Sequence, residues 1–163
     1  MASASCQRGF SLVEALVATA VVATAFGALT HLVVMATRAN AGAMATTLAT
    51  LLAAERADAL SCDLSVAGVG TATLSPADAL EANAVGFSDF FDARGQPLAA
   101  GPPAPPSAAY VRRWAVQALP GGPPGARLLH VVVLAWPHAA PLVGSEARRA
   151  ELARLVVVKA GQE

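Results

Sequence analysis

The chain has 163 residues, of which 55% are hydrophobic and 13% are charged. This balance is too apolar for a disordered chain and low in charge for an ordinary soluble domain, so we expect a membrane or an assembly surface to take up the excess. The 11 basic and 11 acidic side chains cancel, which leaves no broad positive field to attract nucleic acid. Besides a membrane segment, the length allows one small folded head.

An apolar run close to the N-terminus covers residues 10–36. It reads FSLVEALVATAVVATAFGALTHLVVMA, has no Lys or Arg, and contains Glu14 as its single acidic residue. As a helix the run is roughly 40 Å long, more than the ~30 Å hydrocarbon thickness of a bilayer. Arg8 precedes the run and Arg38 follows it. The run predicts one transmembrane helix, and its short leader favours a cytoplasmic N-terminus.

The helical pattern continues beyond the membrane segment, over residues 37–61. Apolar residues recur there at spacings of three, four and seven: Met44, Leu48, Leu51, Leu52 and Ala59. We therefore expect one helix from about Phe10 to Ala59, with an amphipathic second half whose apolar stripe is covered by the head.

Residues 62–107 lose this periodicity and are rich in Gly, Ala, Pro and Ser, which predicts a connecting loop. Within it, Asp92 ahead of Gly95 predicts a tight turn. Asp89 and Asp92 lack the spacing of an EF-hand, so a turn is favoured over a calcium site. His130 and His138 have no Cys or acidic partner at ligand spacing, and the sequence predicts no metal and no cofactor.

The last part of the chain, residues 108–163, changes to a strand pattern. Residues 108–119 and 127–136 are rich in β-branched and aromatic residues and are separated by PGGPPG, which predicts an antiparallel hairpin. A third run, residues 152–160, adds a strand. The expected fold is α+β, with a long N-terminal helix packed against a small antiparallel β-sheet head of three or more strands.

Residues 8–17, RGFSLVEALV, resemble the processing and assembly signature of type IV pilins and of type II secretion pseudopilins. The resemblance implies that residues 1–9 form a leader, that prepilin peptidase cuts after Gly9, and that Phe10 is then N-methylated. It also implies that Glu14 meets the N-terminal amine of a neighbouring subunit during assembly. Independently, an unpaired carboxylate in a membrane helix costs about 2.5–3.5 kcal/mol, which marks Glu14 as functional.

Three alternatives concern single features of this N-terminal segment. Glu14 near the end of the span can instead extend to the lipid headgroups. A secretory signal peptide has an apolar region of about 7–15 residues without acids, whereas this run is longer and contains Glu14. His31 is an ionisable residue within the span, and a neutral, hydrogen-bonded side chain near the outer interface is favoured for it.

The C-terminal part resembles the PilV-like group of minor pilins. The resemblance rests on YVRRWAV, residues 110–116, followed by a Gly/Pro turn and a Val-rich strand that ends in AW. The C-terminal disulfide loop of that family is absent, because cleavage after Gly9 removes Cys6 and leaves Cys62 alone. Arg112, Arg113 and Trp114 offer a small cationic stacking surface, but strand alternation favours one outward arginine with Trp114 packed.

The resemblance implies a minor pilin-like structural subunit of a type IV pilus rather than an enzyme, incorporated through its helix and contributing to filament assembly or initiation. It is expected in the bacterial inner membrane as a single-pass protein with a periplasmic head, and then in the filament. The implied partners are prepilin peptidase, other pilins or pseudopilins, and inner-membrane lipid; nucleic acid is not expected. The alternatives are a minor pseudopilin of a type II secretion system and a competence or adhesion pilin whose head binds DNA or a surface.

Overall fold

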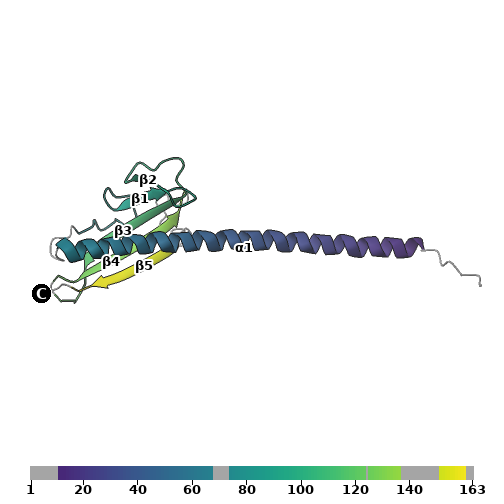
Figure 1. The fold of residues 1–163 in the computed structure, drawn as a ribbon, viewed down its shortest axis with the longest axis horizontal. Helices are drawn as coiled ribbons and strands as arrows, with labels where there is room; N and C mark the ends of the chain where they lie inside the picture. Colours follow the sequence, from purple (N-terminus) through teal and green to yellow (C-terminus); the bar gives the residue numbers. More distant parts are fainter. Residues whose placement is uncertain (1–10, 68–73, 124, 137–150, 161–163) are drawn as a thin grey trace, which may run out of the picture. The chain divides into compact units, whose positions relative to one another are not determined.

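The computed structural model describes residues 11–67, 74–123, 125–136 and 151–160. The chain divides into two compact units, Met1–Ala43 and Met44–Glu163, which are described separately. Helix α1, Leu12–Ala67, provides the described part of the first unit and the first element of the second. The expected α+β fold is confirmed, because the second unit combines the end of α1 with a five-stranded antiparallel sheet (Figure 1).

Helix α1 is long because nothing in its sequence breaks it. It spans 56 residues, and the first proline of the chain is Pro76. Alanine and leucine, both strong helix formers, recur throughout. The helix continues past the expected end at Ala59 because residues 60–67 contain neither Gly nor Pro, and the next glycine is Gly68.

The sheet has the strand order β2-β1-β3-β4-β5, and each neighbouring pair is antiparallel. The strands are β1 Ser88–Phe91, β2 Pro97–Ala100, β3 Tyr110–Ala118, β4 Arg127–Ala135 and β5 Glu151–Lys159. The predicted hairpin is confirmed as β3 and β4, paired from Tyr110↔Ala135 to Ala118↔Arg127. The predicted third strand is β5, which pairs with β4.

Strands β1 and β2 lie within residues 62–107, where the sequence predicted a connecting loop. The structure differs there because each strand has only four residues, too few to show an alternating pattern. In β1 the neighbours Phe90 and Phe91 are both buried, on opposite faces of the sheet. The tight turn between the strands is confirmed: Asp92 Oδ1 accepts the backbone N–H groups of Arg94 and Gln96, both at 2.8 Å.

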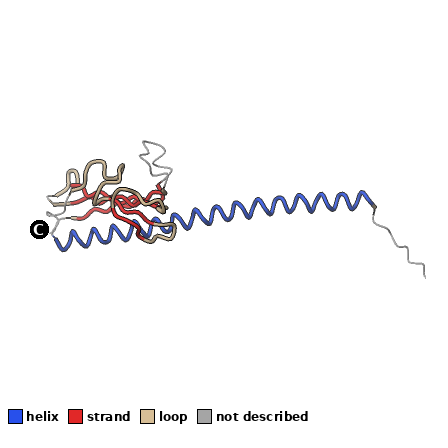
Figure 2. The backbone as a smooth tube through the Cα atoms, turned by 90° about the horizontal axis from the view of Figure 1, so that it is seen from above, coloured by secondary structure: helices blue, strands red, loops and turns tan. Residues whose placement is uncertain are grey.

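One face of the sheet packs against the second half of α1, as Figure 2 shows from above. The helix contributes Ala49, Leu52, Ala53 and Ala57, and the sheet contributes Phe91, Trp114, Val131 and Val133. Three of the four helix residues are alanines spaced four apart, which allows the helix to lie close to large side chains of the sheet. The buried stripe is therefore made largely of small residues.

The expected apolar stripe of α1 is wrong in part for the same reason. Leu52 is buried and Leu48 is partly buried against the core, but Met44, Leu51 and Ala59 are exposed. The prediction was based on the large apolar residues, whereas the face of α1 that packs against the sheet is composed mainly of alanines. Met44 and Leu51 thus remain as apolar surface on the second unit.

The opposite face of the sheet is covered by loops, drawn in tan in Figure 2. Its buried residues are Phe90, Val111, Val132 and Leu134, with Leu80 and Trp136 packed against them. Phe90 and Trp136 meet edge to face, with ring centroids 5.5 Å apart. Both faces of the sheet therefore contribute to the core.

The adjacent arginines of β3 are both buried, which corrects the expectation of one outward arginine. Arg113 lies on the loop side and donates to Asn83 Oδ1 at 2.9 Å and to the carbonyl of Glu81 at 2.8 Å. Arg112 lies on the helix side, where its partners belong to α1 and β1. Trp114 is packed as expected. Arg112 therefore connects the sheet to α1, and Arg113 connects it to the covering loop. The two side chains offer no cationic stacking surface.

Candidate processing and assembly site

The candidate site is the start of α1, where Ser11 acts as the N-cap. The backbone N–H of Glu14 donates to Ser11 Oγ at 3.2 Å, and the N–H of Ala15 donates to the Ser11 carbonyl at 3.1 Å. Glu14 is consequently in the first turn, where a carboxylate interacts favourably with the positive end of the helix dipole. Ser11 was not among the predicted site residues. Its S-x-x-E spacing to Glu14, the pattern of a capping box, was the available signal.

The carboxylate of Glu14 has no partner in the described part of the chain. The side chain is exposed and makes no hydrogen bond or ion pair with any residue that the structure describes. Large apolar side chains surround it on the helix: Leu12, Val13, Leu16 and Val17 are between 56% and 83% exposed. The predicted assembly residue therefore combines a charge with an otherwise apolar surface.

The threonines of the same segment behave differently. Their hydroxyls donate to carbonyls three or four residues earlier, at 2.9–3.0 Å, for Thr19, Thr24, Thr30 and Thr37. Such internal bonds are what a hydrocarbon environment requires of a polar side chain. Over residues 12–37, Glu14 and His31 are the polar side chains left without a partner in the described chain.

Helix α1 contains one stretch that is long and apolar enough to cross a membrane, and none of that stretch is buried. The candidate span is Leu12–Asp63, near the N-terminus, and the narrower span predicted at residues 10–36 stays a prediction. Gly9 and Phe10, the predicted cleavage and methylation residues, lie outside the described residues, as do Cys6, Arg8 and His138.

The head has no metal-binding cluster in the part of the chain that the structure describes. The two carboxylates considered for calcium have other roles, since Asp89 pairs with Arg112 and Asp92 forms the turn. Cys62 is exposed and free. His130 lies in β4, and both of its ring nitrogens are buried without a partner among the described residues.

One family model matches the chain, the prokaryotic N-terminal methylation motif, over residues 4–30. The match contains Gly9, Phe10 and Glu14, so it covers all three residues singled out from the sequence. Comparisons with curated proteins and with solved structures give no match.

Proposed function

We propose that this chain, which its methylation motif marks as type IV pilin-like, is a minor structural subunit of a type IV pilus. The motif implies processing by prepilin peptidase and assembly with other pilins, and together with the apolar helix it fits membrane anchoring. In this proposal residues 1–9 are removed after Gly9 and Phe10 becomes the methylated N-terminus. Residues 10–36 span the inner membrane, and residues 37–61 continue the helix into a periplasmic head, where 62–107 lead to the sheet of 108–163.

The observation that carries the proposal is the carboxylate of Glu14, which has no partner among the described residues and lies within an apolar helix surface. Every threonine of the span is satisfied by its own helix, so the helix is suited to lipid except at Glu14 and His31. Cleavage after Gly9 creates a second charge in the same region, the amine of Phe10. Pairing of this amine with Glu14 of a neighbouring subunit removes two isolated charges from lipid together.

The exposed apolar residues of α1 supply the remaining contacts for assembly. In the second unit Met44 is 67% exposed and Leu51 is 62% exposed, although the same helix buries its alanine face against the sheet. Contacts between different faces of successive subunits produce a filament when the rotation between subunits does not close a ring. The subunit enters the filament through this helix and contributes to its assembly or initiation.

A minor pseudopilin of a type II secretion system carries the same motif and is the alternative. The two roles differ in the neighbouring subunits, so the identity of cross-linked neighbours in the native host separates them. A DNA-binding or adhesive head receives no support from β3, because Arg112 and Arg113 are buried and bonded internally.

Processing is tested by co-expressing the full chain with an active or an inactivated prepilin peptidase and measuring intact mass. We expect the active enzyme alone to remove residues 1–9 and to leave Phe10 with the mass of one added methyl group. An uncut chain, or a cut after an alanine beyond Val22, would contradict the proposed function.

A further inference from the structure

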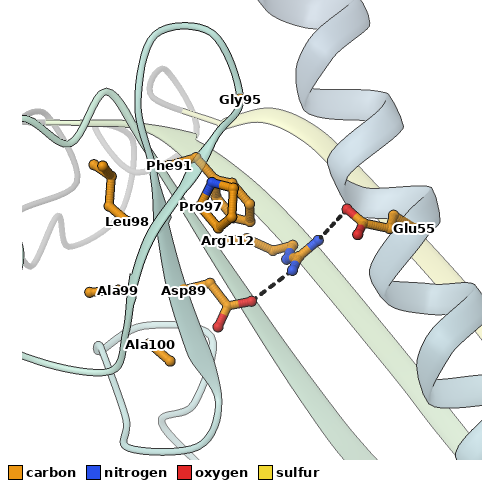
Figure 3. A pocket seen from close by; sticks show the side chains of 9 residues that line it. All are labelled: Glu55, Asp89, Phe91, Gly95, Pro97, Leu98, Ala99, Ala100 and Arg112. Atoms are coloured by element: carbon orange, nitrogen blue, oxygen red, sulfur yellow. Dashed lines mark hydrogen bonds and ion pairs between the residues drawn. The ribbon is translucent and has the colours of Figure 1, made fainter.

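The head contains an open cavity of about 390 Å³ between β2 and Glu55 of α1. Figure 3 shows its lining: Glu55, Asp89, Phe91, Gly95, Pro97, Leu98, Ala99, Ala100 and Arg112. This volume lies within the range of sites that hold small ligands or single side chains, about 300–1,000 Å³. None of these residues belongs to the N-terminal motif.

The guanidinium of Arg112 lies between the two carboxylates of the lining (Figure 3). Its NH2 group donates to Asp89 Oδ2 at 2.7 Å, and its NH1 group donates to the carbonyl of Leu52 at 2.7 Å. The side chain is only 7% exposed. An incoming anion has to displace Asp89 from a short, buried ion pair, so the cavity is not suited to anions.

The two carboxylates leave an excess of negative charge on the lining. Asp89 and Glu55 contribute two negative charges and Arg112 one positive charge, a net charge of −1. Glu55 is 71% exposed, and its Oε2 atom is 3.3 Å from Arg112 NH1, so this contact contributes little to stability and leaves Glu55 available. Arg56 lies over the Trp114 ring and does not line the cavity, although its charge interacts with those of Asp89 and Glu55. The excess negative charge therefore belongs to the lining alone.

The rest of the lining is apolar, and its accessible part is β2, an edge strand with all four residues exposed. Pro97 and the β2 strand offer a wall suited to a methylene chain, whereas Phe91 is 3% exposed and lies beneath the Arg112 guanidinium. Lysine and arginine combine an apolar stem with a cationic end. The geometry and charge of the cavity match that combination.

We infer that this cavity binds a lysine or arginine side chain of a neighbouring filament subunit. The stem lies against Pro97 and the exposed strand β2, and the cation pairs with Glu55 and with Asp89, whose Oδ2 atom accepts from Arg112. The inference rests on the proposed function, because a neighbouring subunit supplies the side chain. It adds a specific polar contact between heads to the contacts made by α1.

The cavity is tested first without assembly, on the detergent-solubilised full chain, by amide chemical shifts of Leu98 and Ala99. The probe is N-acetyl-lysine methylamide, and its uncharged counterpart is N-acetyl-norleucine methylamide. We expect saturable shifts with the lysine probe alone, and affinity about threefold weaker in Glu55→Gln. Asp58→Asn is the matched control, an exposed carboxylate of α1 outside the cavity. The cation site is overturned if the lysine probe does not saturate, or if the norleucine probe binds equally well. It is also overturned if Glu55→Gln binds the lysine probe as tightly as the wild type does.

The source of the side chain is tested in the native host with a photo-reactive benzoylphenylalanine at Leu98. We expect adducts in sheared filaments to a peptide of another subunit that contains Lys or Arg, and about threefold fewer adducts in Glu55→Gln than in Asp58→Asn. The inference is overturned if the adducts contain peptides without a basic residue. It is also overturned if the variant chain is present in filaments but forms no adducts. A chain missing from filaments overturns the proposed function, while the shifts of the detergent experiment still decide whether the cavity binds a cation.

Discussion

The two units of the chain treat their charged groups in opposite ways. In the head, Arg112 and Arg113 are buried, and each is bonded to carbonyl and side-chain oxygens of the same unit. In residues 12–43, Glu14 and His31 have no partner among the described residues. The head therefore binds the cationic ends of its two β3 arginines internally, although both ring nitrogens of His130 stay without a partner among the described residues. In the N-terminal helix the charge of Glu14 has no such internal contact in the described part of the chain.

The apolar residues follow the same division. Val111, Val131 and Val133 of the sheet are fully buried, whereas apolar side chains of the N-terminal helix such as Leu12 and Phe26 are 83% and 66% exposed. Burial of this kind drives folding of a single chain, and exposure of this kind drives insertion into lipid or association. The high apolar content of the chain thus serves two different purposes.

The largest expected effect concerns the unpaired charge of the N-terminal helix. Glu14→Leu retains or improves membrane insertion, because it removes a carboxylate from the hydrocarbon. It leaves the amine of Phe10 on a neighbouring subunit unpaired at a cost of about 3–5 kcal/mol, so recovery in sheared filaments falls by about 100-fold or more. The measurement is membrane content and filament content in the native host.

Thr24→Val is the control for this comparison, since among the described residues the Thr24 hydroxyl donates to the carbonyl of Val21 in the same helix. We expect filament content near the wild-type level for this variant. If Glu14→Leu also enters filaments normally, the assembly role is wrong and extension of Glu14 to the headgroups explains the residue better.

The next effect concerns a charge that the head satisfies by itself. Arg112→Met leaves Asp89, which is only 18% exposed, without its counter-ion and lowers the free energy of unfolding by about 3 kcal/mol. Urea unfolding of the full chain in detergent measures this loss by tryptophan fluorescence, because Trp114 and Trp136 both lie in the head. Arg94→Met, at an exposed turn position, is the control. Equal unfolding midpoints for the two variants would show that the ion pair does not stabilise the head.

The long elements of the fold were predictable from the sequence because their patterns are long. The apolar run of residues 10–36 and the hairpin around PGGPPG each extend over many residues, so one atypical residue does not obscure the pattern. The four-residue strands β1 and β2 were missed, and the alanine stripe at Ala49, Ala53 and Ala57 was not distinguished from the large apolar residues beside it. Both depend on tertiary contacts, which local pattern does not encode.

The predicted site of the N-terminal motif and the cavity of the head differ in what the sequence reveals. Gly9, Phe10 and Glu14 are predictions from a contiguous motif, and the family match covers their positions. The cavity joins Glu55, Asp89 and Arg112, which are far apart in the sequence and lie on α1, β1 and β3. Arg112 and Arg113 can both be buried only because the layers on both faces of β3 provide oxygen atoms that accept their hydrogen bonds. The alternation of residues along one strand does not reveal such partners.

A smaller effect tests how closely the turn of residues 92–96 lies against α1 within the head. Gly95 has φ +80°, and an added Cβ would be 2.7 Å from Leu48 Cδ1. Gly95→Ala is expected to lower the free energy of unfolding by about 1–2 kcal/mol through backbone strain and this contact. Gly86→Ala is the matched control, with φ +78° and nothing within 4 Å, so it reports strain alone. If Gly95→Ala is no more destabilising than Gly86→Ala, the contact with Leu48 adds nothing.

The smallest effect uses the two histidines, one in each unit. Burial lowers the pKa of His130, and the positive charge of Arg154 lowers that pKa further. The unfolded chain, with an ordinary histidine pKa of about 6.5, therefore binds a proton more readily than the folded head. Head stability is complete above that pH and falls as the pH drops through it. We expect the slope of unfolding free energy against pH, measured by tryptophan fluorescence between about pH 5.5 and 7.5, to flatten in His130→Leu. His31→Leu alters the other unit and should leave the slope unchanged; a slope that His130→Leu does not flatten would mean that other groups cause the pH dependence.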